Sequence, residues 1–306
     1  MKLAVPDMIS NSYFPAIAAA ELGFFKREGL DVEVELLFPV DKAYMALRDG
    51  TVDFVGGSAH SALAAFPAWQ GVKLVCAQAQ GMYWFLVMHK DLAVKRGDVA
   101  GVKGRSIGAA PWVEMGLRRL LIEAGVDLVR DDVKIAPVPG AIAAGVNFGV
   151  TAAKALSERK IDGFWANGMG AEVAVRGGIG TVVLDIRRGD GPKDCFNYTM
   201  ASIATTDRLI GRSPELVAAA VRAIGKTQGA LKKDVSLATE IGRKLFPPQE
   251  AGLIAALIRR DLPYYDAKIT LEFVAGMNRF ARDIGILKGE VPYERVVATQ
   301  FAQLWE

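Results

Sequence analysis

The sequence predicts an α/β protein made of two lobes, with the second lobe inserted into the first. Three observations lead to this fold class. Stretches with strand-like alternation take turns with stretches of helical periodicity, which is typical of mixed, mostly parallel sheets with helices on both faces. The chain has 306 residues, more than one hydrophobic core usually organises. The phrase "ALRDGTVDFVGGS" at residues 46–58 returns in altered form as "ALSERKIDGFWAN" at residues 155–167.

The first lobe begins with strands and helices in strict alternation. The expected strands cover residues 2–7, 30–38, 52–57 and 72–79. The expected helices cover residues 12–29, 41–50 and 61–71. Gly29 and Gly50 mark helix ends, because glycine adopts the left-handed conformation that commonly ends a helix.

A second series starts after the segment 85–91. Its expected strands cover residues 105–110, 133–139, 161–167 and 181–186, and its helices cover residues 114–125, 151–160 and 170–178. A return strand is expected at 198–205, then a long helix at 213–234 that starts with Ser213 as N-cap and Pro214 in the first turn. Three more helical segments follow. The chain therefore crosses between lobes near residues 82–87 and 196–203, which gives lobe 1 as 1–84 and 200–306 and lobe 2 as 85–199.

The repeated phrase places one strand end in each lobe. We interpret Asp53 and Asp162, which both copies share, as helix-to-strand turn residues. The copies differ where their strands end, in Gly56-Gly57-Ser58-Ala59-His60 and in Trp165-Ala166-Asn167. Ligands of open α/β sheets bind beyond the carboxyl ends of the strands. We therefore expect the two endings to supply the two sides of one binding cleft.

Composition excludes several classes of protein. A hydrophobic content of 51% with 23% charged residues indicates a globular chain, and a net charge of +3 is too mild to predict nucleic-acid binding. No stretch reaches the roughly 18–20 apolar residues that span a bilayer. The uncharged stretch at residues 138–153 is interpreted as a buried loop and helix.

Cysteine and histidine are scarce and scattered. Cys76 and Cys195 are expected to be buried free thiols; the alternative is a disulfide between them. With only two further candidates, His60 and His89, the sequence offers no metal-ligand spacing. We expect neither a metal nor a cofactor.

Several phrases resemble a known family. "AAELGFFKREGLDVEVEL", "ALRDGTVDFVGGSAHSALAA", "GVKGRSIGAAPWVEMGLRRLLIEAGVD" and "SPELVAAAVRAIGKTQGALKKD" are similar, in this order over residues 1–240, to segments of substrate-binding proteins of bacterial ABC importers. The group concerned serves alkanesulfonates, nitrate, taurine and thiamine pyrimidine precursors. The resemblance implies a type II periplasmic-binding fold with a two-stranded hinge that closes around one small molecule.

The resemblance also implies partners and a compartment. The protein would work as a monomer with the permease and ATPase subunits of the importer, and it would meet the membrane only through the permease. It would be periplasmic, with a signal peptide removed before Met1, because residues 1–8 show no basic region followed by an apolar one. The alternative is a cytoplasmic protein.

A related branch of the same superfamily consists of enzymes that make the thiamine pyrimidine. That branch has a lysine just after the "VD" strand and a cysteine-rich segment near the second hinge. Here Ser58 follows the strand, and "DCFNYTMAS" contains Cys195 alone. Both departures count against that synthase, although His60 lies one position from the family's histidine.

The candidate ligand-binding residues lie in or beside the expected loops, at strand ends and helix starts. They are Asn11, Ser12, Tyr13, Phe14, Ser58, Ala59, His60, Tyr83, Trp84, Trp112, Glu114, Trp165 and Asn167. No catalytic residue is assigned. Five of the candidates also have a structural interpretation: Tyr13 and Phe14 as buried helix residues, Ser58 as an N-cap, His60 as a core histidine, and Glu114 as a residue stabilised by the helix dipole.

Aromatic residues dominate this set, and a ring suits a planar ligand. A carboxylate at Glu114 suits N–H donors and repels sulfonate or nitrate. The sequence therefore favours an importer component that binds an aromatic or heteroaromatic, pyrimidine-like molecule. The alternatives are a cytoplasmic enzyme on the same fold, such as a pyrimidine-precursor synthase or an aromatic decarboxylase with His60 and Glu114 as acid–base groups, and a ligand-sensing module.

Overall fold

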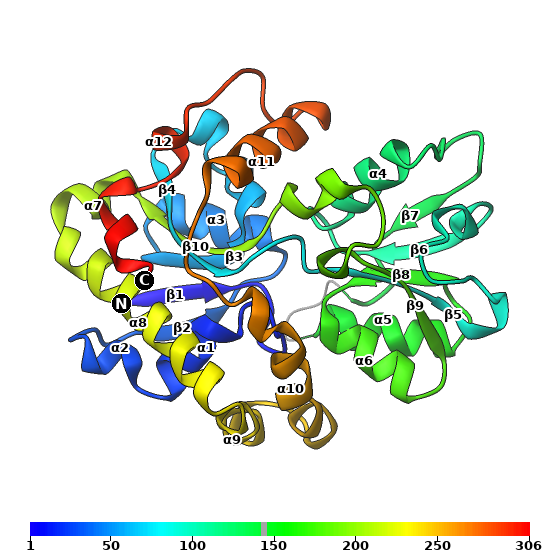
Figure 1. The fold of residues 1–306 in the computed structure, drawn as a ribbon, viewed down its shortest axis with the longest axis horizontal. Coiled ribbons are helices and arrows are strands. Elements are labelled where there is room, and N and C mark those ends of the chain that lie inside the picture. The colour runs from blue at the N-terminus through cyan, green and yellow to red at the C-terminus, as the bar shows by residue number, and fades with distance from the viewer. Residues whose placement is uncertain (142–145) are drawn as a thin grey trace. The chain divides into compact units, whose positions relative to one another are not determined.

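The computed structural model describes residues 1–141 and 146–306, and Figure 1 shows its elements. The chain divides into two compact units. Unit 1 comprises Met1–Gly81 and Asn197–Glu306, and unit 2 comprises Met82–Phe196. Each unit contains a five-stranded sheet.

The sheet of unit 1 has the strand order β2-β1-β3-β10-β4. Its strands are β1 (Lys2–Val5), β2 (Glu33–Leu36), β3 (Phe54–Ser58), β4 (Val72–Ala79) and β10 (Ala201–Thr206). Strand β1 pairs in parallel with β2 and β3, whereas β10 runs antiparallel to β3 and β4. The carboxyl ends of β1 and β3 therefore lie at the same edge of the sheet.

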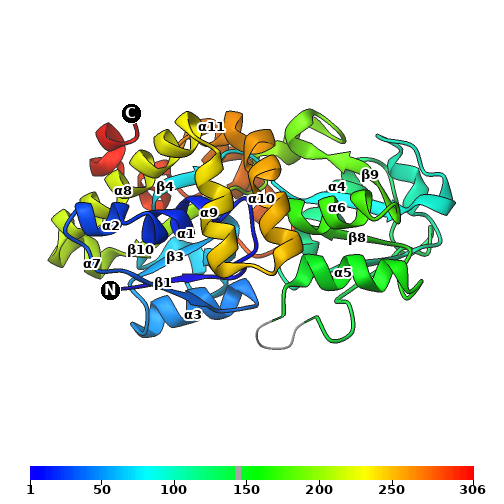
Figure 2. The ribbon, with the colours of Figure 1, turned by 90° about the horizontal axis from the view of Figure 1, so that it is seen from below.

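Helices cover both faces of this sheet. Helix α3 lies on one face, and α1, α2 and α8 lie on the other (Figures 1 and 2). The α-helices of unit 1 are α1 (Phe14–Glu21), α2 (Phe24–Arg27), α3 (Val40–Asp49), α7 (Asp207–Arg212), α8 (Pro214–Lys233), α9 (Ser236–Leu245), α10 (Pro248–Asp261), α11 (Leu271–Asp283) and α12 (Tyr293–Val296). Its 3₁₀ helices are η1 (Ala59–Ala64), η2 (Pro67–Trp69), η7 (Leu262–Tyr264) and η8 (Thr299–Leu304).

The sheet of unit 2 has the order β7-β6-β8-β5-β9. Its strands are β5 (Phe85–His89), β6 (Ser106–Ala109), β7 (Lys134–Ala136), β8 (Gly163–Ala166) and β9 (Gly180–Asp185). Strand β6 is parallel to β7 and β8, and β5 is antiparallel to β8 and β9. Helix α4 (Glu114–Glu123) lies on one face, and α5 (Phe148–Ser157) and α6 (Gly168–Arg176) lie on the other (Figure 1). The 3₁₀ helices η3 (Lys90–Leu92), η4 (Val99–Val102), η5 (Ile186–Arg188) and η6 (Lys193–Asn197) occupy its connections.

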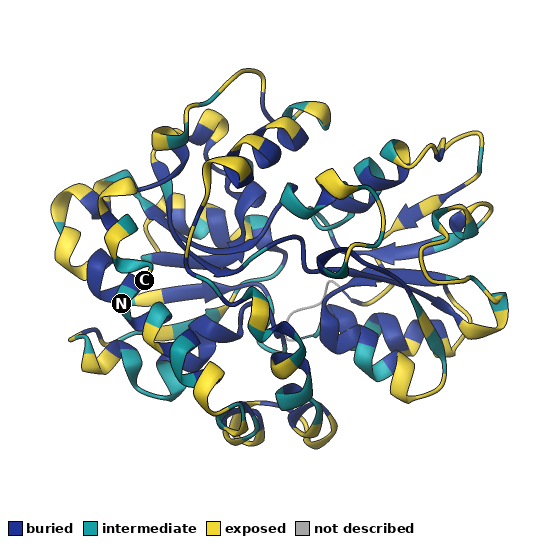
Figure 3. Cartoon of the chain, in the orientation of Figure 1, coloured by how far each residue is buried: buried dark blue, intermediate teal, exposed yellow. Residues whose placement is uncertain are grey.

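The core of each unit lies between its sheet and its helices. Strands β3, β4, β5, β8 and β10 are almost entirely buried, whereas β2 and β7 at the sheet edges are partly exposed. The helices are buried on the sides that face the sheets (Figure 3). Trp69 in unit 1 and Trp165 in unit 2 are the largest fully buried side chains. Within the described part of the chain, no helix combines the length and the apolar character that crossing a bilayer requires.

Two helices expected from the sequence are broken in the structure. The helix predicted at 12–29 is two helices, α1 and α2, because Gly23 takes a left-handed conformation with φ 72° between them. The helix predicted at 61–71 is wrong: η1 and η2 replace it. Pro67 has no N–H and restricts Phe66, and Ala68 and Trp69 have positive φ values of 52° and 60°.

Asp53 and Asp162 do more than shape a turn. The carboxylate of Asp53 accepts from the Lys2 N–H at 2.8 Å, and the Asp53 N–H donates to the Lys2 carbonyl at 2.9 Å. Asp162 makes the same two bonds with Ser106, at 2.8 and 2.9 Å. Both aspartates lie at bends in the helix-to-strand connections, as expected, and in both units the repeated aspartate also joins the starts of two neighbouring parallel strands.

The long uncharged segment at 138–153 is described only in part. Its second half forms the first turns of α5, which begins at Phe148 with the Asn147 side chain accepting from the Val150 N–H at 2.8 Å. Residues 142–145, which belong to the predicted loop of this segment, lie outside the described residues.

Candidate ligand-binding site

The loop after β1 is tightly folded and polar. Ser10, Asn11 and Ser12 are completely buried. The Ser10 hydroxyl accepts from the N–H groups of Ser12, at 3.2 Å, and of Tyr13, at 3.5 Å. The backbone N–H groups of Ser12 and Tyr13, just before α1, therefore form hydrogen bonds within the loop.

The first turn of α1 has few N–H groups left to offer. Pro15 has none, and the Ala16 N–H donates to Oε1 of the buried Gln78 at 3.1 Å. Gln78 in turn donates through Nε2 to the carbonyl of Ser202 at 3.3 Å. A helix start normally attracts an anion through its unpaired N–H groups, and here Gln78 and Ser10 use several of those groups.

Asn11 is held from two sides by the C-terminal part of the chain. Its Nδ2 donates to Oδ2 of Asp261, and the hydroxyl of Tyr265 donates to its backbone carbonyl. Asp261 and Tyr265 are completely buried. Within residues 1–141 and 146–306, Asn11 Oδ1 and Ser12 Oγ have no hydrogen-bond partner although both atoms are buried. Buried polar atoms are rarely left in this state, and each of these two atoms has the capacity for one more hydrogen bond.

The end of β3 lies at the same sheet edge and is closed by internal bonds. Ser58 Oγ lies 2.6 Å from Ser61 Oγ, and the Tyr44 hydroxyl donates to the Ser58 carbonyl at 3.0 Å. The Ala59 N–H donates to the Met200 carbonyl at 2.9 Å. Ser58 caps no α-helix, because a 3₁₀ helix without a side-chain cap follows it.

His60 belongs to a buried polar and aromatic cluster in unit 1. Its Nδ1 lies 2.9 Å from the Thr199 hydroxyl. Its ring meets the edge of Phe280, with 5.4 Å between ring centroids, and Phe280 stacks on Tyr198 at 4.5 Å. These contacts fix the orientation of the imidazole.

Unit 2 gathers three of the predicted aromatic residues into one cluster. The ring centroids of Tyr83 and Trp84 are 4.9 Å apart, and those of Trp84 and Trp165 are 6.2 Å apart. The Arg187 guanidinium lies 5.5 Å from the centre of the Tyr83 ring. All three rings are buried, and within the described chain Trp165 Nε1 has no hydrogen-bond acceptor.

The start of α4 lies beside this cluster. A Cβ placed on Gly116 would lie 3.2 Å from the Trp84 ring, so the first turn of α4 packs closely on that ring. Glu114 is the first residue of α4, where the helix dipole stabilises a carboxylate. Trp112, two residues earlier, is half-buried and has a positive φ of 68°, a conformation that costs about 1 kcal/mol or more in a non-glycine residue.

Asn167 has a structural role that is visible in the geometry. Its Oδ1 accepts from the N–H groups of Met169, at 3.0 Å, and Gly170, at 3.3 Å, and so caps α6. The side-chain oxygen is therefore used at the helix start, as expected of an N-cap asparagine.

The free thiols are both buried, which confirms that part of the sequence prediction. Burial raises the pKa of the Cys76 thiol far above its ordinary value, because the thiolate loses its hydration. Cys76 therefore stays protonated and unreactive.

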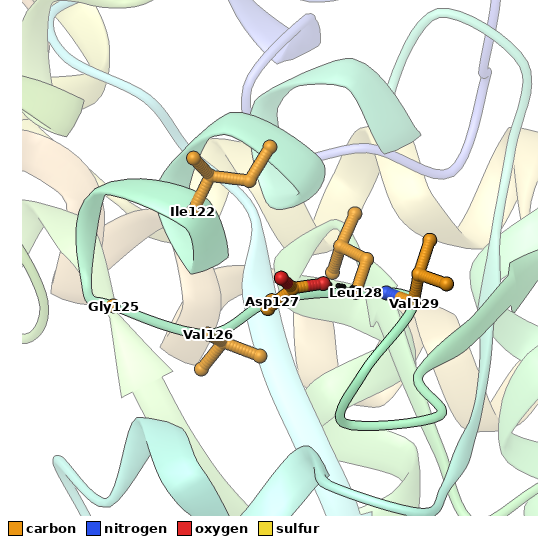
Figure 4. Close-up of a pocket in the computed structure, with 6 residues that line it drawn as sticks. All are labelled: Ile122, Gly125, Val126, Asp127, Leu128 and Val129. Carbon is orange, nitrogen blue, oxygen red and sulfur yellow. Dashed lines mark hydrogen bonds between the residues drawn. The ribbon is translucent and has the colours of Figure 1, made fainter.

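A surface groove of about 530 Å³ lies at the end of α4 (Figure 4). Its lining is mostly apolar and comes from Ile122, Gly125, Val126, Asp127, Leu128 and Val129. The Asp127 carboxylate points back to its own loop and accepts from the N–H groups of Val129 and Arg130. None of the predicted site residues contributes to it, and we do not assign the ligand to this groove.

The comparisons with known proteins place the chain in a family. The profile of the family described as "NMT1/THI5 like" matches residues 10–234, well over half of the sequence. The chain belongs to this family. The resemblance seen in the sequence is thereby confirmed. None of the curated proteins compared matches the chain significantly.

Solved structures agree with the family on the fold. A structure from Bordetella bronchiseptica RB50 superposes with a TM-score of 0.77 at 21% identity, covering 99% of this chain and 95% of that one. The alkanesulfonate-binding protein SsuA from Xanthomonas axonopodis pv. citri gives 0.71 at 13% identity over 98% and 96%. The desulfurization enzyme DSZB gives 0.68 at 14% over 99% and 97%. The predicted two-lobed periplasmic-binding fold is confirmed.

Within each unit, the structure brings most of the predicted residues to one edge. In unit 1 this holds for Asn11–Phe14 and Ser58–His60, which follow the adjacent strands β1 and β3. In unit 2, Tyr83, Trp84 and Trp165 form one cluster with the start of α4 beside it.

Sequence reasoning missed the residues that hold this family member's first loop: Gln78, Asp261 and Tyr265. The last two lie beyond the matched residues 10–234. One signal was available, since an aspartate at the end of an amphipathic helix opposes the helix dipole.

Proposed function

We propose that this protein is the solute-binding component of an ABC importer and that it closes around one small planar ligand, a heteroaromatic molecule of the pyrimidine type. The protein would bind and release the ligand without changing it.

The main support for a neutral ligand with a hydrogen-bond donor is the set of polar groups in the loop between β1 and α1. It presents a buried amide oxygen at Asn11 and a buried hydroxyl at Ser12, and the N–H groups of Ser12, Tyr13 and Ala16 are already used. An amide oxygen accepts hydrogen bonds and repels an anion. The loop therefore suits a neutral ligand that carries an N–H or O–H donor.

The residues of unit 2 support the same class. Glu114 puts a carboxylate at the start of α4, which disfavours an anion there. Trp165 Nε1 is a donor whose acceptor is not found among the described residues. An aminopyrimidine carries both an amino donor and ring-nitrogen acceptors, and aromatic side chains favour its flat face.

The importer role rests on the family and on the fold. One similar structure is an alkanesulfonate-binding protein and another is described as a periplasmic nitrate-binding protein. We therefore propose a periplasmic monomer that delivers its ligand to permease and ATPase subunits. Fusion of the native amino-terminal coding region to a reporter enzyme active only outside the cytoplasm tests the compartment. A reporter that stays inactive argues for the cytoplasmic alternative.

A ligand screen by thermal shift tests the proposed function. We expect 4-aminopyrimidine and related amino heterocycles to raise the Tm, because a ligand that binds only the folded state stabilises it. Benzenesulfonate and nitrate serve as anionic comparisons and should leave the Tm unchanged. A rise with the anions alone would refute the proposed ligand class. Mass spectrometry of any ligand carried through purification supplies an independent answer.

The enzyme alternative has one observation in its favour, the similarity to the desulfurization enzyme DSZB. In this chain, however, His60 is engaged with Thr199 and packed on Phe280, and the Cys76 thiol is unreactive. We expect candidate ligands to be recovered intact after long incubation with the purified protein. Conversion of a ligand at a rate that falls in His60→Gln would establish the enzyme instead.

A further inference from the structure

Asp261 occupies a position that is energetically unfavourable for a carboxylate. It is the last residue of α10, where the helix dipole disfavours negative charge, and its side chain is completely buried. One oxygen accepts from Nε of the neighbouring Arg260 at 3.1 Å. The other oxygen accepts from Nδ2 of Asn11, a residue 250 positions earlier in the chain.

This hydrogen bond decides which way the Asn11 amide faces. A carboxylate oxygen can only accept, so the NH₂ end of the amide must point toward Asp261. The oxygen end, Oδ1, must then point away, and it is the end that lacks a partner among the described residues. The Tyr265 hydroxyl fixes the backbone of Asn11 at the same time.

We infer that Asp261 is a positioning residue that sets the hydrogen-bond polarity of the ligand site. By holding the NH₂ group of Asn11, Asp261 leaves the site with an acceptor and makes it select ligands with an N–H donor over shape-matched ligands that lack one. The inference rests on the proposed function for its ligand and on the structure alone for the orientation of the amide. No family-level match covers Asp261, because the matched residues end at 234.

The first arm of the test measures selectivity with two probes of the same shape. 4-Aminopyrimidine carries the donor, and 4-methylpyrimidine replaces the amino group with a methyl group. We expect the wild-type protein to bind the amino probe about tenfold more tightly by calorimetry, a typical value for one neutral hydrogen bond. In Asp261→Asn the amide of Asn11 is free to turn, and the preference should shrink to within about threefold.

Asn278→Ala is the matched control, and Asn11→Ala is the positive comparison. Asn278 is also a buried asparagine of unit 1, donates through Nδ2 to the Val291 carbonyl at 3.0 Å, and has an Oδ1 without a partner in the described chain. Asn11→Ala should abolish the preference, and Asn278→Ala should retain it. Wild-type selectivity in Asp261→Asn would overturn the inference.

The second arm needs no ligand. The chain contains five asparagines, so selective ¹⁵N labelling of asparagine side chains gives a spectrum in which Asn11 is assigned by its loss in Asn11→Ala. Asp261→Asn should shift the Asn11 NH₂ signals and leave those of Asn278 in place. Unmoved Asn11 signals would overturn the inference. If neither probe binds the wild-type protein, the proposed ligand class fails, and this arm still decides whether Asp261 orients Asn11.

Discussion

The sheets of unit 1 and unit 2 follow one plan. Their orders, β2-β1-β3-β10-β4 and β7-β6-β8-β5-β9, place corresponding strands in corresponding positions, with the antiparallel strand fourth in each. In each unit an aspartate at the start of the third strand in this order joins it to the second, Asp53 to Lys2 of β1 and Asp162 to Ser106 of β6.

The two units differ in the residues at the end of the third strand and in the helix that follows it. In unit 1, β3 ends in two glycines and a serine and continues as a 3₁₀ helix without a side-chain cap. In unit 2, β8 ends in Trp165 and Ala166 and leads directly into α6, whose first N–H groups are capped by Asn167. The two sheets thus share the aspartate hydrogen bonds at the amino ends of their strands and differ in the residues at the carboxyl ends. Substitutions at the two ends therefore test the similarity and the difference separately.

The largest effect is expected where the helices of unit 2 cross. A Cβ on Gly170 of α6 would lie 2.7 Å from the carbonyl oxygen of Gly149 in α5. Gly170→Ala should therefore lower the free energy of unfolding by about 3 kcal/mol, since backbone atoms cannot make room as a flexible side chain can. Urea denaturation measures this loss.

Gly229→Ala is the control for this substitution. Gly229 lies within α8 of unit 1, and no atom would come within 4 Å of its added Cβ. Its replacement should be neutral or should stabilise by up to about 1 kcal/mol through helix propensity. Equal losses in both variants would show that the crossing of α5 and α6 is looser than described.

The repeated aspartates should differ in strength. Asp162 accepts from both the N–H and the hydroxyl of Ser106, whereas Asp53 accepts from the Lys2 N–H alone at an exposed strand start. We expect Asp162→Ala to cost about 2 kcal/mol of unfolding free energy and Asp53→Ala about 1 kcal/mol. Denaturation of both variants measures the two losses of unfolding free energy. A larger loss for Asp53→Ala than for Asp162→Ala would contradict the comparison of the two strand starts.

A pH-dependent contribution is expected in unit 1, where α8 is tied to α2. The buried carboxylate of Glu28 accepts from Lys226 Nζ and from Arg222 Nε, and these hydrogen bonds hold its pKa below the ordinary value. A lowered folded-state pKa gives stability that is present above the unfolded-state pKa and is lost as the pH falls through the folded-state pKa. Glu28→Gln should therefore cost about 1 kcal/mol at pH 7.

The difference between the wild type and Glu28→Gln should shrink below about pH 4.5, as acid protonates Glu28. Thermal melts between pH 3 and pH 7 follow it. Glu290→Gln is the control, because Glu290 also pairs with an arginine, Arg282 at 2.7 Å, but is 84% exposed. A pH-independent loss in Glu28→Gln would mean that packing of the side chain, and not its charge, ties α2 to α8.

The smallest expected effect concerns ligand affinity. Trp165→Phe keeps a ring in the cluster of unit 2 and removes Nε1, and we expect the affinity for 4-aminopyrimidine to fall about threefold to tenfold. Trp69→Phe makes the same change in unit 1, where Trp69 is also fully buried with an Nε1 that has no partner in the described residues. Equal affinities in both variants would remove Trp165 from the proposed site.

Local patterns sufficed for the fold. Alternating periodicity, the glycines at helix ends and the repeated phrase indicated two α/β lobes, and Gly29 does follow α2 with a positive φ of 81°. They failed where one residue overrides a pattern, as Gly23 and Pro67 do in breaking two expected helices. An apolar run does not reveal such a break, because its periodicity continues on both sides.

Hydrogen-bond partners that lie far apart in the sequence could not be predicted from local sequence patterns. The residues around Asn11 were recognised from their place after the first strand, but Asp261 and Tyr265 come from 250 and 254 positions further along. Similarly, the pairing of His60 with Thr199 depends on β10 returning beside β3. A single sequence carries no record of these contacts.

The position of β10 in its sheet also sets an order of events during synthesis. Every strand of the unit 2 sheet is made by Asp185, whereas the unit 1 sheet lacks the strand between β3 and β4 until Thr206 emerges, and Asp261 reaches Asn11 later still. The inserted unit is therefore able to fold first, although the chain begins with the other. The loop between β1 and α1 receives its hydrogen bond from Asp261 only after residue 261 has been made.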